Sequence, residues 1–154
     1  MEVLQPEIGN QKVKSHQNPK NVKTTIVISR FILGLGFVVF GLNILHPFLP
    51  QPPIPEGSLP ARFMGVMGPS HWMALVGIFQ LFGGVFVLFG RTTPIGLTLL
   101  GPVLVNILAF HVLLMGGAGI APGLVFSALE LFLIYAYRSY FAPIFTMNAV
   151  PTSK

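Results

Sequence analysis

Residues 26 to 45, IVISRFILGLGFVVFGLNIL, form an uninterrupted run of mostly apolar side chains. Three further runs follow, from Trp72 to Phe89, from Ile95 to Met115 and from Pro122 to Tyr137. Each approaches the roughly 20 residues that cross a hydrocarbon core about 30 Å thick. Because lipid offers no partners to backbone amides, each run is expected to be a helix.

The overall composition supports this reading. Hydrophobic residues make up 53% of the chain and charged residues 8%, against roughly 25% charged residues in ordinary soluble domains. We therefore predict an all-α membrane protein, a bundle of four transmembrane helices over residues 26–141. The fourth run is the shortest, and we expect it to continue through Arg138 to Phe141.

Eight of the nine Lys and Arg residues flank the same ends of the predicted spans, and only Arg62 lies on the other side. This bias predicts that both termini are cytoplasmic. Residues 1–25 are expected to be a flexible basic tail and residues 142–154 a short cytoplasmic tail. The lysines of the first tail are sparse and lack interleaved aromatic residues, so no nucleic-acid partner is expected.

Seven of the fourteen prolines fall between Pro47 and Pro69, in the predicted outer loop. Proline excludes a regular helix throughout this segment. Beyond it, Ser58 is placed to cap a short interfacial helix over Ala61 to Met67. The loop is interpreted either as a stiff connector or as a lid that docks an outer partner, and the connector is favoured. Glycines are frequent within the spans, where they let helices approach closely.

Few polar residues lie within the predicted spans, so any chemistry must come from them. We expect one polar cavity that opens outward and binds a cofactor or ligand. Its candidate residues are Asn43, His46, Gln80, Asn106, His111 and Glu130.

Glu130 is the most informative of these residues. A carboxylate near the bilayer centre costs about 2.5 to 3.5 kcal/mol on insertion scales, so its side chain should face the bundle interior. It is interpreted either as a group that exchanges protons or hydrogen-bonds a quinone carbonyl, or as a structural group that bonds to polar side chains of other helices.

The three histidines near the outer side, His46, His71 and His111, fall on different elements and show no paired-ligand spacing. No metal or haem site is expected from them. Cysteine is absent, which excludes thiol–disulfide exchange with a quinone. Any redox role then needs a bound quinone or a redox protein partner to carry the electrons.

Short motifs in this order resemble the DoxX family of small four-helix membrane proteins, over roughly Arg30 to Phe141. They are RFILG from residue 30, FGLN from residue 40, QLFGG from residue 80, GR at residue 90 with Pro94, NI at residue 106, FH at residue 110 and RSYF from residue 138. The resemblance implies a location in the bacterial cytoplasmic membrane. It also implies a link to quinone-coupled sulfur oxidation or to membrane complexes that resist oxidative stress.

Two functions follow as expectations. In one, the protein is a membrane subunit that binds a quinone near Asn106, His111 and Glu130 and supports a redox partner. In the other, it is a non-catalytic scaffold or assembly factor. A small-solute carrier is disfavoured because no pair of broken helices is evident. The oligomeric state stays open, a homo-oligomer included.

Overall fold

The computed structural model describes residues 19–51 and 53–147, and within these ranges the regular structure is entirely helical. The elements are α1 (Pro19–Leu45), α2 (Leu59–Met67), α3 (Trp72–Leu88), α4 (Thr93–Ala109), the π-helix η1 (Phe110–Leu114), α5 (Ala121–Ala136), α6 (Arg138–Phe141) and the 3₁₀-helix η2 (Ala142–Phe145). The prediction of an all-helical chain is confirmed for this part of the sequence.

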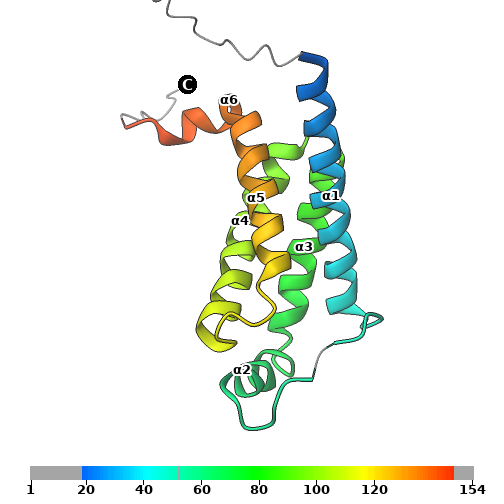
Figure 1. Ribbon diagram of the computed structural model, residues 1–154, viewed down its shortest axis with the longest axis vertical. Coiled ribbons are helices and arrows are strands. Elements are labelled where there is room, and N and C mark those ends of the chain that lie inside the picture. Colours follow the sequence, from blue (N-terminus) through cyan, green and yellow to red (C-terminus); the bar gives the residue numbers. More distant parts are fainter. Residues whose placement is uncertain (1–18, 52, 148–154) are drawn as a thin grey trace, which may run out of the picture.

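Four long helices lie side by side (Figure 1). Contacts join α1 to α3, α3 to α4, α4 to α5 and α5 back to α1. One end of this arrangement carries α2 and the turn between η1 and α5, and the other carries α6 and the connection from α3 to α4. Each helix therefore runs antiparallel to the next one along this ring.

Two to four of these helices could span a membrane. α1 from Asn21 to Leu45 is long and apolar enough by itself, as is α4 continued by η1, from Thr93 to Leu114. Two further candidates are bent pairs, in which α2 meets α3 at 82° and α5 meets the segment Arg138–Phe145 at 77°.

The start of the first helix differs from the prediction. α1 begins at Pro19, seven residues before the apolar run, because proline suits the first helical turn, where an N–H has no partner. The remainder of the predicted tail, residues 1–18, lies outside the described residues, as do residues 148–154 of the C-terminal tail.

The fourth span was predicted to continue through Arg138 to Phe141; these residues are helical, as α6, but the segment Arg138–Phe145 lies at 77° to α5. α5 ends at Ala136, because the next residue, Tyr137, has a φ of −99° and a ψ of 17°, outside the helical region. Arg138 turns back, because its Nη1 donates to the Tyr135 carbonyl at 3.1 Å and its guanidinium lies 4.7 Å from the centre of the Tyr135 ring.

The short helix of the outer loop is confirmed. Ser58 is the N-cap of α2, and its Oγ accepts a hydrogen bond from the Ala61 amide at 3.4 Å. The Phe63 ring lies 5.7 Å from the Phe110 ring of η1, between centroids. α2 thus crosses the end of the four long helices and is held there by an aromatic contact.

Glycines set the distance between α1 and α3. A Cβ atom on Gly84 would lie 2.6 Å from the Gly34 carbonyl oxygen, and one on Gly41 would lie 2.8 Å from the Gly77 carbonyl oxygen. Gly34 and Gly41 are seven residues apart on α1, and Gly77 and Gly84 are seven residues apart on α3. Seven residues make about two helical turns, so the two contacts lie on one face of each helix. Here the two backbones touch with no side chain between them, as the glycine content predicted.

α3 meets α4 in the same manner, since a Cβ atom on Gly96 would lie 2.7 Å from the Gly83 carbonyl oxygen.

The core between the helices is aliphatic and aromatic. Its buried hydrophobic members are Leu33, Phe37, Val87, Leu97, Leu100, Val103, Leu104 and Leu133.

Arg30 joins α1 to the end of α3. Its Nε donates to the Val87 carbonyl at 3.1 Å and its Nη2 donates to the Leu88 carbonyl at 2.6 Å. The last carbonyls of a helix lack helical donors and carry the negative end of its dipole. Arg30, which was predicted to mark the orientation and belongs to the first resemblance motif, therefore caps α3.

Replacing Gly84 with alanine should destabilise the fold by about 1 to 3 kcal/mol, because the new methyl group meets backbone atoms of α1 that no side-chain rotation can move. Equilibrium unfolding in mixed micelles measures this loss. Gly65→Ala in α2 is the matched control, since nothing lies within 4 Å of its Cβ position. Equal stabilities for the two variants would contradict the close backbone contact.

Candidate functional site

Glu130 is the one acidic side chain buried between the long helices in the part of the chain described. It lies on α5, and only 3% of its surface is exposed. Neither carboxylate oxygen has a hydrogen-bond partner among the described residues. A buried charged or polar group without a partner is costly, which makes Glu130 the first candidate for a residue that binds a ligand or a proton.

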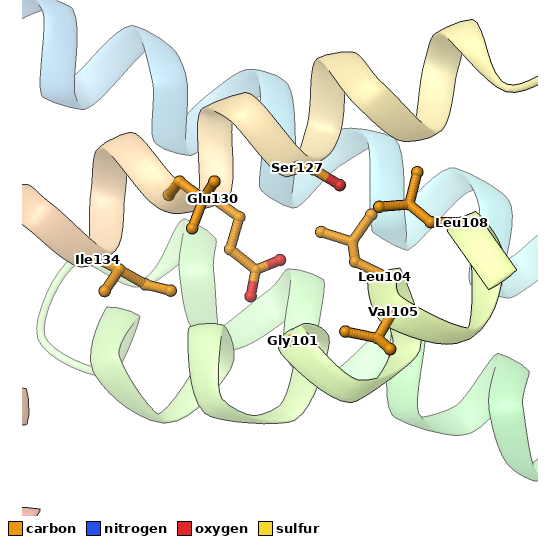
Figure 2. A pocket seen from close by; sticks show the side chains of 8 residues that line it. Gly101, Leu104, Val105, Leu108, Ser127, Glu130 and Ile134 are labelled. Carbon is orange, nitrogen blue, oxygen red and sulfur yellow. The ribbon is translucent and has the colours of Figure 1, made fainter.

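A cavity of about 280 Å³ lies beside this carboxylate, between α4 and α5. Figure 2 shows the Glu130 side chain reaching from α5 towards the backbone of α4 near Gly101. The cavity is lined by Gly101, Leu104, Val105, Leu108, Ser127, Glu130, Leu131 and Ile134. Val105 and Leu131 are each 67% exposed, so the cavity opens sideways onto the outer surface of the two helices.

Gly101 and Ser127 shape the space around the carboxylate. A Cβ atom on Gly101 would lie 3.3 Å from Glu130 Oε1, so the absence of a side chain gives the carboxylate room beside α4. The Ser127 hydroxyl donates to the Gly123 carbonyl at 2.8 Å within its own helix. Neither residue was predicted to line the pocket, although Ser127 lies three residues before Glu130 and so shares its helix face.

The site lies at mid-height of the long helices. Gly101 is eight residues from either end of α4, which is about 12 Å along the helix axis at about 1.5 Å per residue. If α4 crosses a membrane, the carboxylate is therefore remote from both water layers. A ligand would then reach it sideways, from the lipid.

Asn43 fixes the start of the proline-rich loop. Its side chain is buried, and its Oδ1 accepts hydrogen bonds from the Phe48 amide at 2.9 Å and the Leu49 amide at 2.7 Å. These bonds fold the start of the proline-rich loop back onto the end of α1. The neighbouring His46 is exposed. Neither residue lines the Glu130 cavity.

Gln80 is buried on α3, with 3% of its surface exposed, and its Oε1 has no hydrogen-bond partner among the described residues. It does not line the cavity. Gln80 thus shares with Glu130 a buried unpartnered oxygen, but on a different helix.

Asn106 and His111 bond to their own helix. Asn106 is exposed, and its Nδ2 donates to the Pro102 carbonyl at 2.9 Å. His111 lies on the π-helix, with Nδ1 2.8 Å from the Ile107 carbonyl oxygen; because a carbonyl only accepts, Nδ1 carries the proton in this contact. Gly119, at φ 70° in the turn between η1 and α5, lies beside the ring, where a Cβ atom would be 3.4 Å from His111 Cδ2, an ordinary contact.

The structure therefore does not gather the six predicted residues into one polar cavity. Of these, only Glu130 lines the pocket beside it. Asn43 bonds to a loop, Asn106 and His111 bond to their own helix, His46 is exposed, and Gln80 is buried elsewhere on α3. The cavity is apolar apart from Glu130 and Ser127, and it opens sideways rather than towards the end of the helices that carries α2.

No family model, curated protein or solved structure matches this chain. The geometry of the pocket must therefore carry the functional interpretation.

The effects of two substitutions on stability distinguish a residue that serves a ligand from a residue that stabilises the fold. Glu130→Leu should raise the free energy of unfolding by roughly 1 to 3 kcal/mol, because it removes an unpartnered buried carboxyl. Asn43→Leu should lower it by roughly 1 to 3 kcal/mol, because two amides lose their acceptor. Unfolding in mixed micelles measures both. A large loss of stability in Glu130→Leu would show that the carboxyl is structural.

Proposed function

We propose that this chain is a DoxX-like integral membrane protein of the bacterial cytoplasmic membrane, and that it serves as the membrane subunit of a quinone-linked redox complex. In this proposal the complex acts in sulfur metabolism or in resistance to oxidative stress. The proposed quinone binding rests on one observation: the unpartnered Glu130 carboxyl lies beside an apolar cavity that opens sideways between α4 and α5.

Four crossings are proposed, by α1, α3, α4 with η1, and α5. α3 and α5 have 17 and 16 residues, or about 26 and 24 Å, and a bilayer adapts to spans a few Å shorter than its core of about 30 Å. The basic residues support cytoplasmic termini, because Lys23, Arg30, Arg91 and Arg138 belong to the end opposite Arg62 and α2.

We propose that the pocket takes the head-group ring of a quinone. Its volume of about 280 Å³ lies just below the roughly 300 to 1,000 Å³ typical of ligand pockets, which suits one ring. In this proposal the aliphatic walls contact the ring, the sideways opening leaves the isoprenoid tail in lipid, and Glu130, whose two oxygens are buried in the structure, turns towards the opening to hydrogen-bond a ring oxygen. Because the chain has no cysteine, the electrons come from a redox protein partner.

One set of contacts favours the second function, a scaffold or assembly factor. Asn43, Asn106 and His111 all bond to backbone carbonyls or amides of their own segment. In this alternative only the fold and the surface matter, and the Glu130 cavity is empty of any specific ligand.

The membrane topology is tested by cysteine labelling, since any introduced cysteine is unique in this chain. We expect an impermeant maleimide added outside to label Gln51→Cys and Ala118→Cys in intact cells. Lys23→Cys and Thr146→Cys should be labelled only after the membrane is opened. Labelling of positions 23 and 146 from opposite sides would contradict an even number of crossings.

The ligand is tested by solvent extraction of protein purified from its native membrane in mild detergent. We expect the wild type to retain close to one quinone per chain and Glu130→Leu to retain about tenfold less, because one hydrogen bond to the head group is lost. Asn106→Leu is the control, since Asn106 lies outside the cavity and should leave retention unchanged. Equal retention by the wild type and Glu130→Leu would favour the scaffold.

A further inference from the structure

Asn106 presents a polar side chain to the outside of the four long helices. It lies within the apolar stretch Thr93–Leu114, which is long enough to cross a membrane by itself. Leu114, the nearer end of this stretch, is eight residues away, or about 12 Å at about 1.5 Å per residue. Asn43 and Gln80 on the other long helices are buried, whereas Asn106 is exposed. Where α4 crosses a membrane, the Asn106 amide therefore lies among lipid tails.

The helix satisfies only part of this side chain. The Asn106 nitrogen carries two hydrogens, and one is donated to the Pro102 carbonyl at 2.9 Å. Among the described residues, nothing bonds to the second hydrogen or to Oδ1. One donor and one acceptor thus stay open, and lipid tails can pair with neither. Polar groups left unpaired in hydrocarbon are costly, so a partner for this amide is strongly favoured.

A second copy of the chain supplies both missing partners. Because the same basic residues orient every copy, all copies insert in the same direction and place Asn106 at the same depth. Around a two-fold axis normal to the membrane, the free hydrogen of each amide meets the Oδ1 of the other. Asn side chains form hydrogen bonds of this kind between membrane helices. The side chain is thus complementary to itself.

The surface around Asn106 allows a second helix to approach. Pro102 and Ala109 lie four residues before it and three residues after it, on the same side of α4. Their small side chains leave room for close packing. Successive residues of a helix are about 100° apart around its axis, so Val105, which lines the Glu130 cavity, faces a different side. The Asn106 surface and the cavity opening are therefore separate.

We infer that two copies of this chain pair in parallel through the outward face of α4, joined within the membrane by reciprocal hydrogen bonds between their Asn106 amides. The inference goes beyond the proposed function, because it requires neither a quinone nor a redox partner. It rests on α4 with η1 as a membrane crossing.

Self-association is measured by energy transfer between donor-labelled and acceptor-labelled full chains in liposomes, with the dyes on Gln51→Cys and with increasing dilution by lipid. We expect the wild-type chain to associate and Asn106→Leu to associate roughly tenfold more weakly, because the hydrogen bonds between the helices are lost. Asn106→Gln keeps the amide and should restore most of the association. Thermal unfolding in micelles shows whether each variant is folded.

Oxidative cross-linking in native membranes locates the contact. Ala109→Cys and Leu113→Cys, three and seven residues after Asn106, should each form disulfide-linked dimers. Leu35→Cys is the matched control and should stay monomeric, because Leu35 is 56% exposed but belongs to α1, across the ring from α4. These variants retain Asn106, so the measurement decides even if Asn106→Leu does not fold.

Each outcome bears on the inference. Association that falls in Asn106→Leu and returns in Asn106→Gln, with cross-links at positions 109 and 113, supports it. A wild-type chain that stays monomeric overturns it. Association that is unchanged in Asn106→Leu, or cross-links through Leu35→Cys instead, overturns the assignment to this face of α4. Cross-links from position 109 to a different protein, with none between two copies, overturn the second copy as the partner.

Discussion

The contact between the backbones of α1 and α3 at Gly34 and Gly84 determines where most other elements lie. Because no Cβ atom separates the helices there, they pack closely enough for Arg30 on α1 to reach the last carbonyls of α3. α3 in turn holds α4 through Gly83 and Gly96. In lipid, where burial of apolar surface does not drive helix association, such close packing is the main attraction between helices.

α5 is held differently, and this difference creates the site. Its main contact with α1 is the Phe126 ring, which occupies the space left by Gly36 and lies 5.5 Å from the Phe37 ring. On its other side, α5 faces α4 across the Glu130 cavity rather than through backbone contact. Glycine pairs close the interfaces of α3, whereas Gly101 faces the Glu130 carboxyl rather than another backbone.

Hydropathy and local chemistry predicted the helices, the Ser58 cap and the close glycine contacts, because these depend on nearby residues. The direction of each polar side chain was not predictable in this manner. Asn43 is buried as expected, but it bonds to the loop that follows α1 rather than to another helix. Asn106 faces outward, and its Nδ2 donates to the Pro102 carbonyl of the same helix. The end of α5 at Tyr137 depends on a single backbone bend, which composition does not indicate.

The shortness of α5 has a consequence for biogenesis in the proposed orientation. It has 16 residues and carries Glu130 at its centre, so its own transfer from the translocon into lipid is weakly favourable at best. α4 with η1 is long and strongly apolar, and its Gly101 already provides a place for the carboxyl. If α5 crosses the bilayer, we therefore expect it to enter as one half of a helical hairpin with α4, so that Glu130 meets Gly101 during that step.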